Sequence, residues 1–230
     1  MDRYNNSIYQ EIERRQIKYL CHFTPQNNLE HIKNYGLLLR NEMPCGATIT
    51  DSTRADNVRS AICMTISKPN RWMLEQKQRE GHHLALLLIS PDVLFMRKCL
   101  FYPHNAATAS LRRRPIEDFM GIDAFKEIFA EEVEYKKSGK ESQIIRRSSH
   151  LSAAETTSDQ AEVQCLEQIS PQHIMRIITY NIPLDYQDVQ ILAGKLFLNP
   201  QRYRNIPAER LIYPKPNNTY DPDNIIEIDF

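Results

Sequence analysis

The chain has 230 residues, of which 41% are hydrophobic and 25% are charged, and its 29 lysines and arginines balance its 29 aspartates and glutamates. This length suits one domain with a sizeable core, and the composition is that of a globular protein. The balanced charge argues against a protein that coats nucleic acid indiscriminately, since that affinity comes from many contacts between cations and phosphates. A local basic groove remains compatible with it.

Membrane, secretory and zinc-binding classes are also disfavoured. No stretch approaches the roughly 18 consecutive apolar residues of a membrane span, and the polar N-terminus MDRYNNSIYQEIERRQ is unlike a signal peptide. We therefore expect a cytoplasmic protein with no membrane contact. The five cysteines are scattered and never spaced as C-x₂-C, which favours free thiols over a disulfide framework or a metal site.

The N-terminal part predicts an extension followed by a strand and a helix. Residues 1–16 are interpreted as an extension or short helix outside the core, and residues 17–21 (IKYLC) as a buried strand. Thr24 is a good N-cap, Pro25 suits the first helical position, and Gly36 supplies the stop. A helix is therefore expected between Pro25 and Gly36.

The middle of the chain predicts three further strands and two helices. After an irregular loop at 40–60, residues 61–66 (AICMTI) are expected to form a strand, and residues 67–70 (SKPN) to open a short helix. Residues 84–89 (LALLLI) are interpreted as a central strand and residues 99–102 (CLFY) as a short one. Apolar residues recur at helical spacing between 115 and 131, which predicts an amphipathic helix.

The last third begins with a long polar segment. Residues 136–160 are rich in serine, threonine and charge, and a loop of this length inside a domain is often functional. Strands are predicted at 161–166 (AEVQCL) and 174–180, a helix at 184–192, and an edge strand in the final NIIEIDF. With no repeat and no second core, residues 1–230 are predicted to form a single α+β domain, with small central β-sheets, few helices and long functional loops.

Polar residues at strand ends mark the candidate site. His22 and Thr24 end the first strand, Arg54 and Asp56 lie in the loop before the second, and Glu162 starts a strand after the long polar segment. Sites are usually built where strands meet loops. The alternative is structural, since a histidine that ends a strand is more often structural and a glutamate that opens one is usually solvated.

Two motifs resemble a known family. Residues 19–24 (YLCHFT), with Asn28-Leu29, Ile32 and a Gly-Leu-Leu at 36–38, are similar to the opening motif of the DarT family of DNA ADP-ribosyltransferase toxins. Residues 159–163 (DQAEV), followed by Ile-Ser-Pro at 169–171, resemble its catalytic segment. Further blocks at 66–70 and 105–107 keep the family's order. The similarity covers residues 17–180, and its ordered blocks are specific although each alone is not.

The resemblance implies an ADP-ribosyltransferase-like fold with NAD as co-substrate and no metal. Glu162 matches the catalytic glutamate, and Arg54, with Arg59 as the alternative, matches the active-site arginine. The implied cofactor-binding residues are His22, which holds the adenosine-side ribose, together with Thr24, Asn28, Arg54, Ser67 and Asn70.

The resemblance also places a substrate-recognition loop at residues 136–160. Its implied nucleic-acid-binding residues are Lys136, Lys137, Lys140, Arg146, Arg147 and His150, with Arg112–Arg114 as a second basic run. Tyr135 or His150 is a candidate for stacking on an unpaired base. Base pairing hides the target atom, so single-stranded DNA is the expected substrate, with RNA as the alternative. A macrodomain antitoxin is the implied partner.

Within the family, the block at 67–73 (SKPNRWM) is unlike the thymidine-modifying branch and resembles the branch associated with guanosine, or a relative that acts on RNA. Two less favoured hypotheses are an RNA 2′-phosphotransferase, against which Glu162 speaks, and a catalytically inactive module that binds nucleic acid.

Overall fold

The computed structural model describes residues 6–50, 56, 58 and 60–179. The predicted helix at 184–192 and the predicted last strand therefore lie outside the described residues. No helix in the described part is long and apolar enough to cross a membrane.

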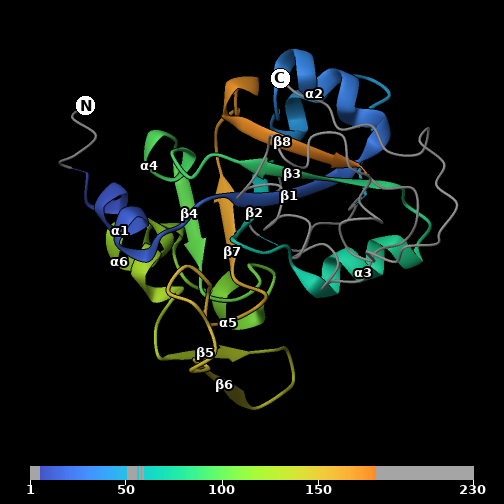
Figure 1. The fold of residues 1–230 in the computed structure, drawn as a ribbon. Coiled ribbons are helices and arrows are strands. Elements are labelled where there is room, and N and C mark those ends of the chain that lie inside the picture. The colour runs from blue at the N-terminus through green and yellow to red at the C-terminus, as the bar shows by residue number, and fades with distance from the viewer. Residues whose placement is uncertain (1–5, 51–55, 57, 59, 180–230) are drawn as a thin grey trace, which may run out of the picture.

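A six-stranded antiparallel sheet forms the centre of the molecule, in the order β4-β7-β2-β1-β3-β8 (Figure 1). With a two-stranded sheet and helices around it, the architecture confirms the predicted α+β class. The strands are β1 (Leu20–Pro25), β2 (Ile62–Ile66), β3 (Leu84–Ile89), β4 (Cys99–Tyr102), β7 (Glu162–Cys165) and β8 (Ile174–Thr179), with β5 (Glu132–Lys136) and β6 (Ser142–Arg146) in the second sheet.

The large sheet forks between β1 and β2. These strands pair only at Leu20↔Ile66 and Cys21↔Thr65, whereas β1 pairs with β3 along its whole length. Figure 1 shows the result: β4 and β7 run across the direction of β1, β3 and β8. Beyond the pair Cys21↔Thr65, the two strands therefore separate and leave an opening between them.

Every residue of β3 is buried, and the core spreads from this strand to the helices. Helix α1 (Ser7–Arg15) packs beside α4 (Val93–Met96) and α6 (Gly121–Glu127). Ile12 of α1 is only 2% exposed. The prediction that residues 1–16 lie outside the core was therefore wrong, because this helix has an apolar face that contributes to the core.

The first helix begins later than its capping residues predicted. Thr24 and Pro25 belong to β1, where they pair with Ala85 and Leu84 of β3. A 3₁₀ turn (η2, Gln26–Asn28) follows, then α2 (Leu29–Tyr35), which ends at Gly36 with φ of +78° as predicted. Pairing with β3 overrides the local capping signal.

The predicted helix at 115–131 is two pieces, because Met120 is extended and Gly121 has φ of +79°. The pieces are η4 (Ile116–Phe119) and α6. The remaining short elements are η3 (Arg40–Glu42), α3 (Arg71–Arg79), α5 (Ala109–Arg112) and η5 (Pro171–His173).

The segment at 136–160 departs from the predicted loop only in its first part, since residues 147–160 form turns and bends without a helix or strand. Strands β5 and β6 pair in register as a hairpin from Glu132↔Arg146 to Lys136↔Ser142. The hairpin is anchored to the body of the protein, since the Tyr135 ring stacks on His104 with centroids 3.9 Å apart and the backbone N–H of Lys136 donates to Ser110. A composition rich in polar residues is equally compatible with an exposed hairpin.

Candidate active site

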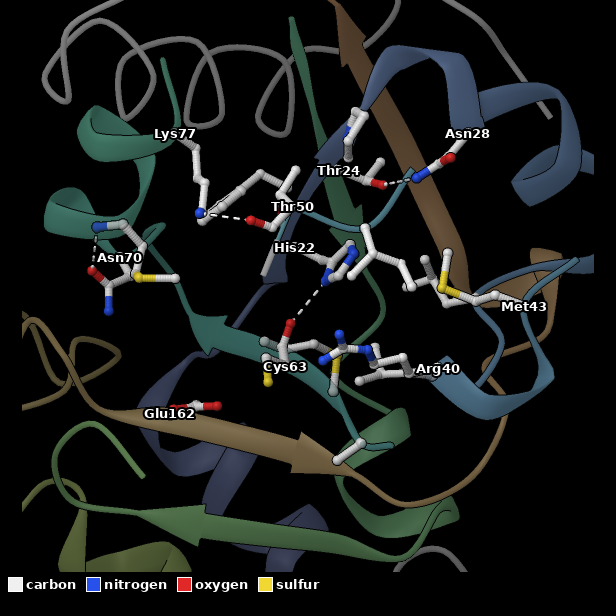
Figure 2. A pocket seen from close by; sticks show the side chains of 18 of the residues that line it. His22, Thr24, Asn28, Arg40, Met43, Thr50, Cys63, Asn70, Lys77 and Glu162 are labelled. Atoms are coloured by element: carbon white, nitrogen blue, oxygen red, sulfur yellow. Dashed lines mark hydrogen bonds between the residues drawn. The ribbon is translucent and has the colours of Figure 1, made fainter. Parts of the chain in front are cut away.

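A cavity of about 1100 Å³ occupies the fork between β1 and β2. Its wall is formed by β1, β2 and the start of β7, and α2, α3 and the segment 43–50 enclose it (Figure 2). Pockets for drug-sized ligands measure about 300–1,000 Å³, so this cavity is large enough for a ligand at the upper end of that range. His22 and Glu162 both line it.

His22 projects from β1 into the fork. A ring nitrogen, Nδ1, lies 2.8 Å from the carbonyl oxygen of Cys63 on β2 (Figure 2). A carbonyl only accepts, so Nδ1 carries the proton and Nε2 is left as a hydrogen-bond acceptor. Desolvation lowers the pKa of His22 below its usual value, which keeps the ring neutral near pH 7. Nε2 is therefore a neutral hydrogen-bond acceptor beside the cavity.

Asn28 and Thr24, two predicted cofactor-binding residues, hold a segment of the pocket wall. The Asn28 amide accepts from the backbone N–H of Thr48 at 2.9 Å and donates to the Thr48 carbonyl at 3.0 Å. It also donates to the Thr24 hydroxyl at 3.2 Å. Asn28 thereby fixes residues 43–50, which we call the strap. Both residues line the cavity, but the polar atoms of Asn28 are engaged with the strap.

Asn70 and Ser67, also predicted as cofactor-binding, differ in position. Asn70 lines the cavity and caps α3 by accepting from the N–H of Met73 at 3.1 Å. Ser67 is outside the lining, and its hydroxyl donates to the carbonyl of Ala154. Ser67 also has φ of +61°, so its observed contacts belong to the turn between β2 and α3.

Two cationic side chains that sequence reasoning missed belong to the pocket. Arg40 points from η3 toward the middle of the cavity, beside His22 and Cys63 (Figure 2). Lys77 of α3 is 7% exposed and donates to the carbonyl of Thr50 at the end of the strap. Neither residue lies in a recognised motif, and residues 40–60 had only been interpreted as an irregular loop.

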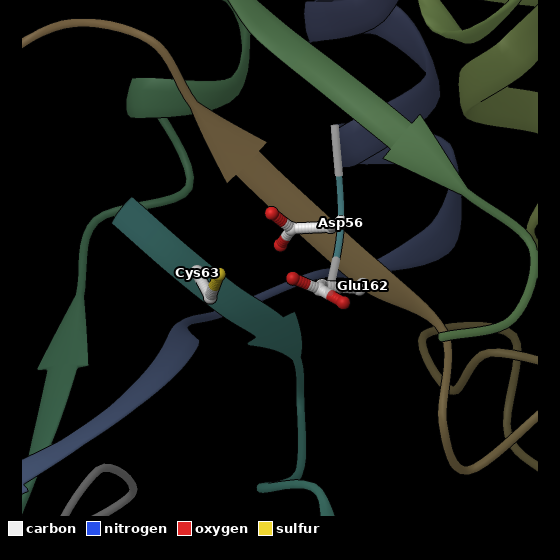
Figure 3. A group of neighbouring side chains, drawn as sticks. All are labelled: Asp56, Cys63 and Glu162. Atoms are coloured by element: carbon white, nitrogen blue, oxygen red, sulfur yellow. The ribbon is translucent and has the colours of Figure 1, made fainter. Parts of the chain in front are cut away.

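The predicted active-site arginine, Arg54, and its alternative, Arg59, lie outside the described residues. The same loop contributes Asp56, which is described and lines the cavity. Asp56, Cys63 and Glu162 each place one oxygen or sulfur atom within 4.8 Å of the others (Figure 3). The expectation of a site without a metal is untested.

Glu162 is the first residue of β7 and opposes Tyr102 of β4. One carboxylate oxygen accepts from the backbone N–H of Ala106 at 3.1 Å, and the other accepts from the side-chain amide of Gln164 at 3.0 Å. The carboxylate is therefore fixed at both oxygens while it faces the cavity. A fixed negative charge can stabilise positive charge that develops on a ligand.

The predicted nucleic-acid-binding residues have different surroundings. Lys136, Lys137, Lys140 and His150 are all exposed, and of these Lys137 also lines the cavity, with its Nζ 5.9 Å from the Tyr135 ring centroid. Arg146 and Arg147 instead have partners within the protein. Arg146 pairs with Glu132 on the exposed hairpin. Arg147 donates to the carbonyls of Ser152 and Glu155 and to the Thr157 hydroxyl, so it stabilises the turns that lead to Glu162.

No curated protein matches the chain. A solved structure of DarTG from Thermosipho africanus, in complex with ADP-ribose, is 14% identical with a TM-score of 0.45, and the match covers 80% of this chain and 48% of that one. The present chain thus spans about half the length of that protein.

A family model described as "ssDNA thymidine ADP-ribosyltransferase, DarT" matches residues 21–205. This match confirms the resemblance found in the motifs around His22 and Glu162. The chain belongs to the DarT family of single-stranded-DNA ADP-ribosyltransferases.

Proposed function

We propose that this chain transfers ADP-ribose from NAD to a base of single-stranded DNA, with Glu162 as the catalytic carboxylate. The observation that carries the proposal is that Glu162 and His22, which come from opposite sides of the fork, line one cavity. Family membership supplies the chemistry, and the cavity supplies the residues that perform it.

The reaction breaks the bond between nicotinamide and ribose and forms a bond from a base nitrogen to the ribose carbon. Nicotinamide leaves as a neutral molecule with the bonding electron pair, and the base nitrogen gives one proton to Glu162. Positive charge develops on the ribose as the bond breaks, as in glycoside cleavage. Glu162 stabilises this charge and accepts a hydrogen bond from a ribose hydroxyl, which contributes most in the transition state.

NAD lies along the fork in this proposal. His22 accepts a hydrogen bond from the adenosine-side ribose through Nε2. Arg40 provides positive charge for the pyrophosphate, since a guanidinium binds phosphate oxygens through paired N–H groups. Asn28 keeps the strap in place over the dinucleotide, and Thr24 and Asn70 complete the wall. Arg54 remains the proposed active-site arginine on the basis of the resemblance alone.

DNA enters from the side of Glu162 where α5 and the hairpin begin. Arg112 and Lys137 line that side of the cavity, and Lys136, Lys140 and Arg146 extend positive charge along the hairpin. We also propose Trp72 as a stacking surface for an unpaired base, since it lines the cavity and is 53% exposed. Tyr135 is already stacked on His104.

The full biological setting belongs to the proposal. We propose that the partner is an antitoxin macrodomain and that the enzyme acts in the cytoplasm as a single domain, with residues 136–160 as its recognition segment. The target base is a separate question, because the family description names thymidine and the block at 67–73 resembles the other branch.

The test is transfer from NAD to matched single-stranded DNA and RNA oligonucleotides, followed by mass analysis of the digested nucleosides. Modified DNA nucleosides with the native chain, and none with Glu162→Gln, are expected. The mass names the base directly. Modification of RNA alone would replace DNA as the substrate, and release of 2′-phosphate from RNA would replace the reaction. No product with either polymer would refute the transferase proposal.

A further inference from the structure

Gln164 lies on the same face of β7 as Glu162 and is fully buried, with 0% of its surface exposed. Its backbone is paired on both sides, with Cys63 of β2 and Leu100 of β4. A long polar side chain enclosed in the middle of a sheet is uncommon. Its hydrogen bonds therefore indicate why this position is a glutamine.

The amide nitrogen of Gln164 lies between two carboxylates. Nε2 donates to Glu162 at 3.0 Å and to Asp56 at 3.0 Å. An amide nitrogen has two hydrogens, so both are used. The orientation of the amide follows from chemistry, because the flipped amide would place its oxygen against two carboxylate oxygens with no proton between them.

The amide oxygen of Gln164 has the opposite situation. It is buried, and none of the described residues donates to it. Leaving a buried acceptor unsatisfied destabilises a fold, and such groups are rare in native proteins. Packing alone therefore does not explain the glutamine, since a methionine would fill a similar volume without the unsatisfied oxygen. Positions that violate folding rules in this way are expected at functional sites.

From this arrangement we propose that Gln164 is the positioning residue of the catalytic carboxylate and that Asp56 anchors Gln164. The proposal rests on the proposed function of Glu162. With Ala106 holding one oxygen and Gln164 the other, the Glu162 carboxylate has a single orientation toward the cavity. Asp56, which comes from a loop 108 residues away in the sequence, prevents the Gln164 amide from rotating.

The first experiment compares Gln164→Met with the native full-length chain. Methionine keeps the length and removes both N–H donors, so the carboxylate gains rotational freedom. Misplacement of a reacting group by about 1 Å costs about 10²-fold in rate, so we expect kcat for transfer to fall roughly 10- to 100-fold. The KM for NAD is expected to stay within about threefold, because binding depends on the rest of the fork.

Stability is the second readout. Methionine removes the unsatisfied buried oxygen but also both N–H donors to Glu162 and Asp56, so the Tm of Gln164→Met should fall by no more than about 10 °C. Gln168→Met is the matched control, since Gln168 is exposed, is not among the residues that line the cavity, and donates to the backbone carbonyl of Tyr35. This control should leave kcat unchanged. Native kcat in Gln164→Met, or a kcat loss that only accompanies a large fall in Tm, would overturn the proposal.

Two variants of Asp56 test its part as an anchor. Asparagine still offers an oxygen to the Gln164 amide, so Asp56→Asn should keep kcat within about threefold, whereas Asp56→Ala should lower it by about tenfold. A loss in Asp56→Asn as large as that in Glu162→Gln would overturn the anchoring role, because it would show that the charge of Asp56 is required. Full activity of Glu162→Gln would instead refute the proposed function itself.

Discussion

Replacing Glu162 by glutamine tests the central electrostatic claim with little change of shape. A carboxylate about 4 Å from a developing positive charge, at an effective dielectric constant of about 20, stabilises that charge by about 4 kcal/mol. Loss of this interaction corresponds to a fall in rate of about 10³-fold. The new amide has one acceptor for the two donors, Ala106 and Gln164, that now hold the carboxylate. It must therefore reorient, and we expect the loss to reach at least this size.

The assay separates the transition state from binding. Single-turnover transfer of labelled ADP-ribose gives the rate, and calorimetry gives the affinity for NAD, which should change by less than about tenfold. Glu117→Gln is a suitable control, since Glu117 is exposed on η4 and does not line the cavity. A Glu162→Gln enzyme that retains its rate but binds NAD far more weakly would refute the reasoning, because the carboxylate would then act on the ground state.

Three further predictions concern the DNA contact and the fold. The first replaces Lys136, Lys137 and Arg146 of the hairpin by neutral residues and keeps Arg147, whose hydrogen bonds are structural. The slope of log affinity for single-stranded DNA against log salt concentration should become smaller by about 2. An unchanged slope would show that the hairpin does not contact the DNA backbone. Urea unfolding should show a far larger loss for Gly36→Ala than for Gly81→Ala. Both glycines have positive φ, but only at Gly36 would a Cβ meet the Ile169 carbonyl, at 2.0 Å; equal losses would contradict the clash. Hydrogen bonding from Arg14, together with Arg15, lowers the pKa of Glu11 to about 2 from 4.5. Because the folded pKa is the lower one, this stabilisation is present above pH 4.5 and is lost as the pH falls toward 2. This stabilisation amounts to about 2 kcal/mol after allowance for the exposed Arg14. In the variant Glu11→Gln, the free energy of unfolding should therefore depend less on pH in that window.

The strands could be predicted because most of them are short apolar runs between polar segments. Residues 84–89 and 99–102 were predicted with the observed bounds, and the start of β7 at Glu162 followed from the end of the polar segment. Thr24 and Pro25 predicted a helix start, but both residues are also compatible with the end of a strand, which is where they lie. Only the pairing with β3, about 60 residues further along, decides between them.

The site was predictable only where it coincides with a motif. His22 and Glu162 carry the family's pattern, and the cavity contains both. Asp56 had been noticed, but its bond to Gln164 joins positions 108 residues apart. The position of Arg40 and the hydrogen bonds from Asn28 to Thr48 of the strap likewise depend on the path of the chain after α2. The spacing of residues along the sequence carries no information on such contacts, because the fold of the sheet brings their partners together.

The fork also explains why a histidine and a carboxylate from different strands can serve one reaction. Had β1 and β2 continued to pair beyond Cys21, the carbonyl of Cys63 would belong to the ladder and the space between the strands would be closed. Because the strands part, that carbonyl is available to the Nδ1–H of His22, and the bond replaces a backbone hydrogen bond that the open sheet lacks. The same bond fixes the tautomer that leaves Nε2 as the acceptor proposed for ribose. On the other side, β2 pairs with β7, so Cys63 lies opposite Gln164, two residues from Glu162. One opening in the ladder thus sets both the tautomer of His22 and its position relative to Glu162, the proposed catalytic carboxylate.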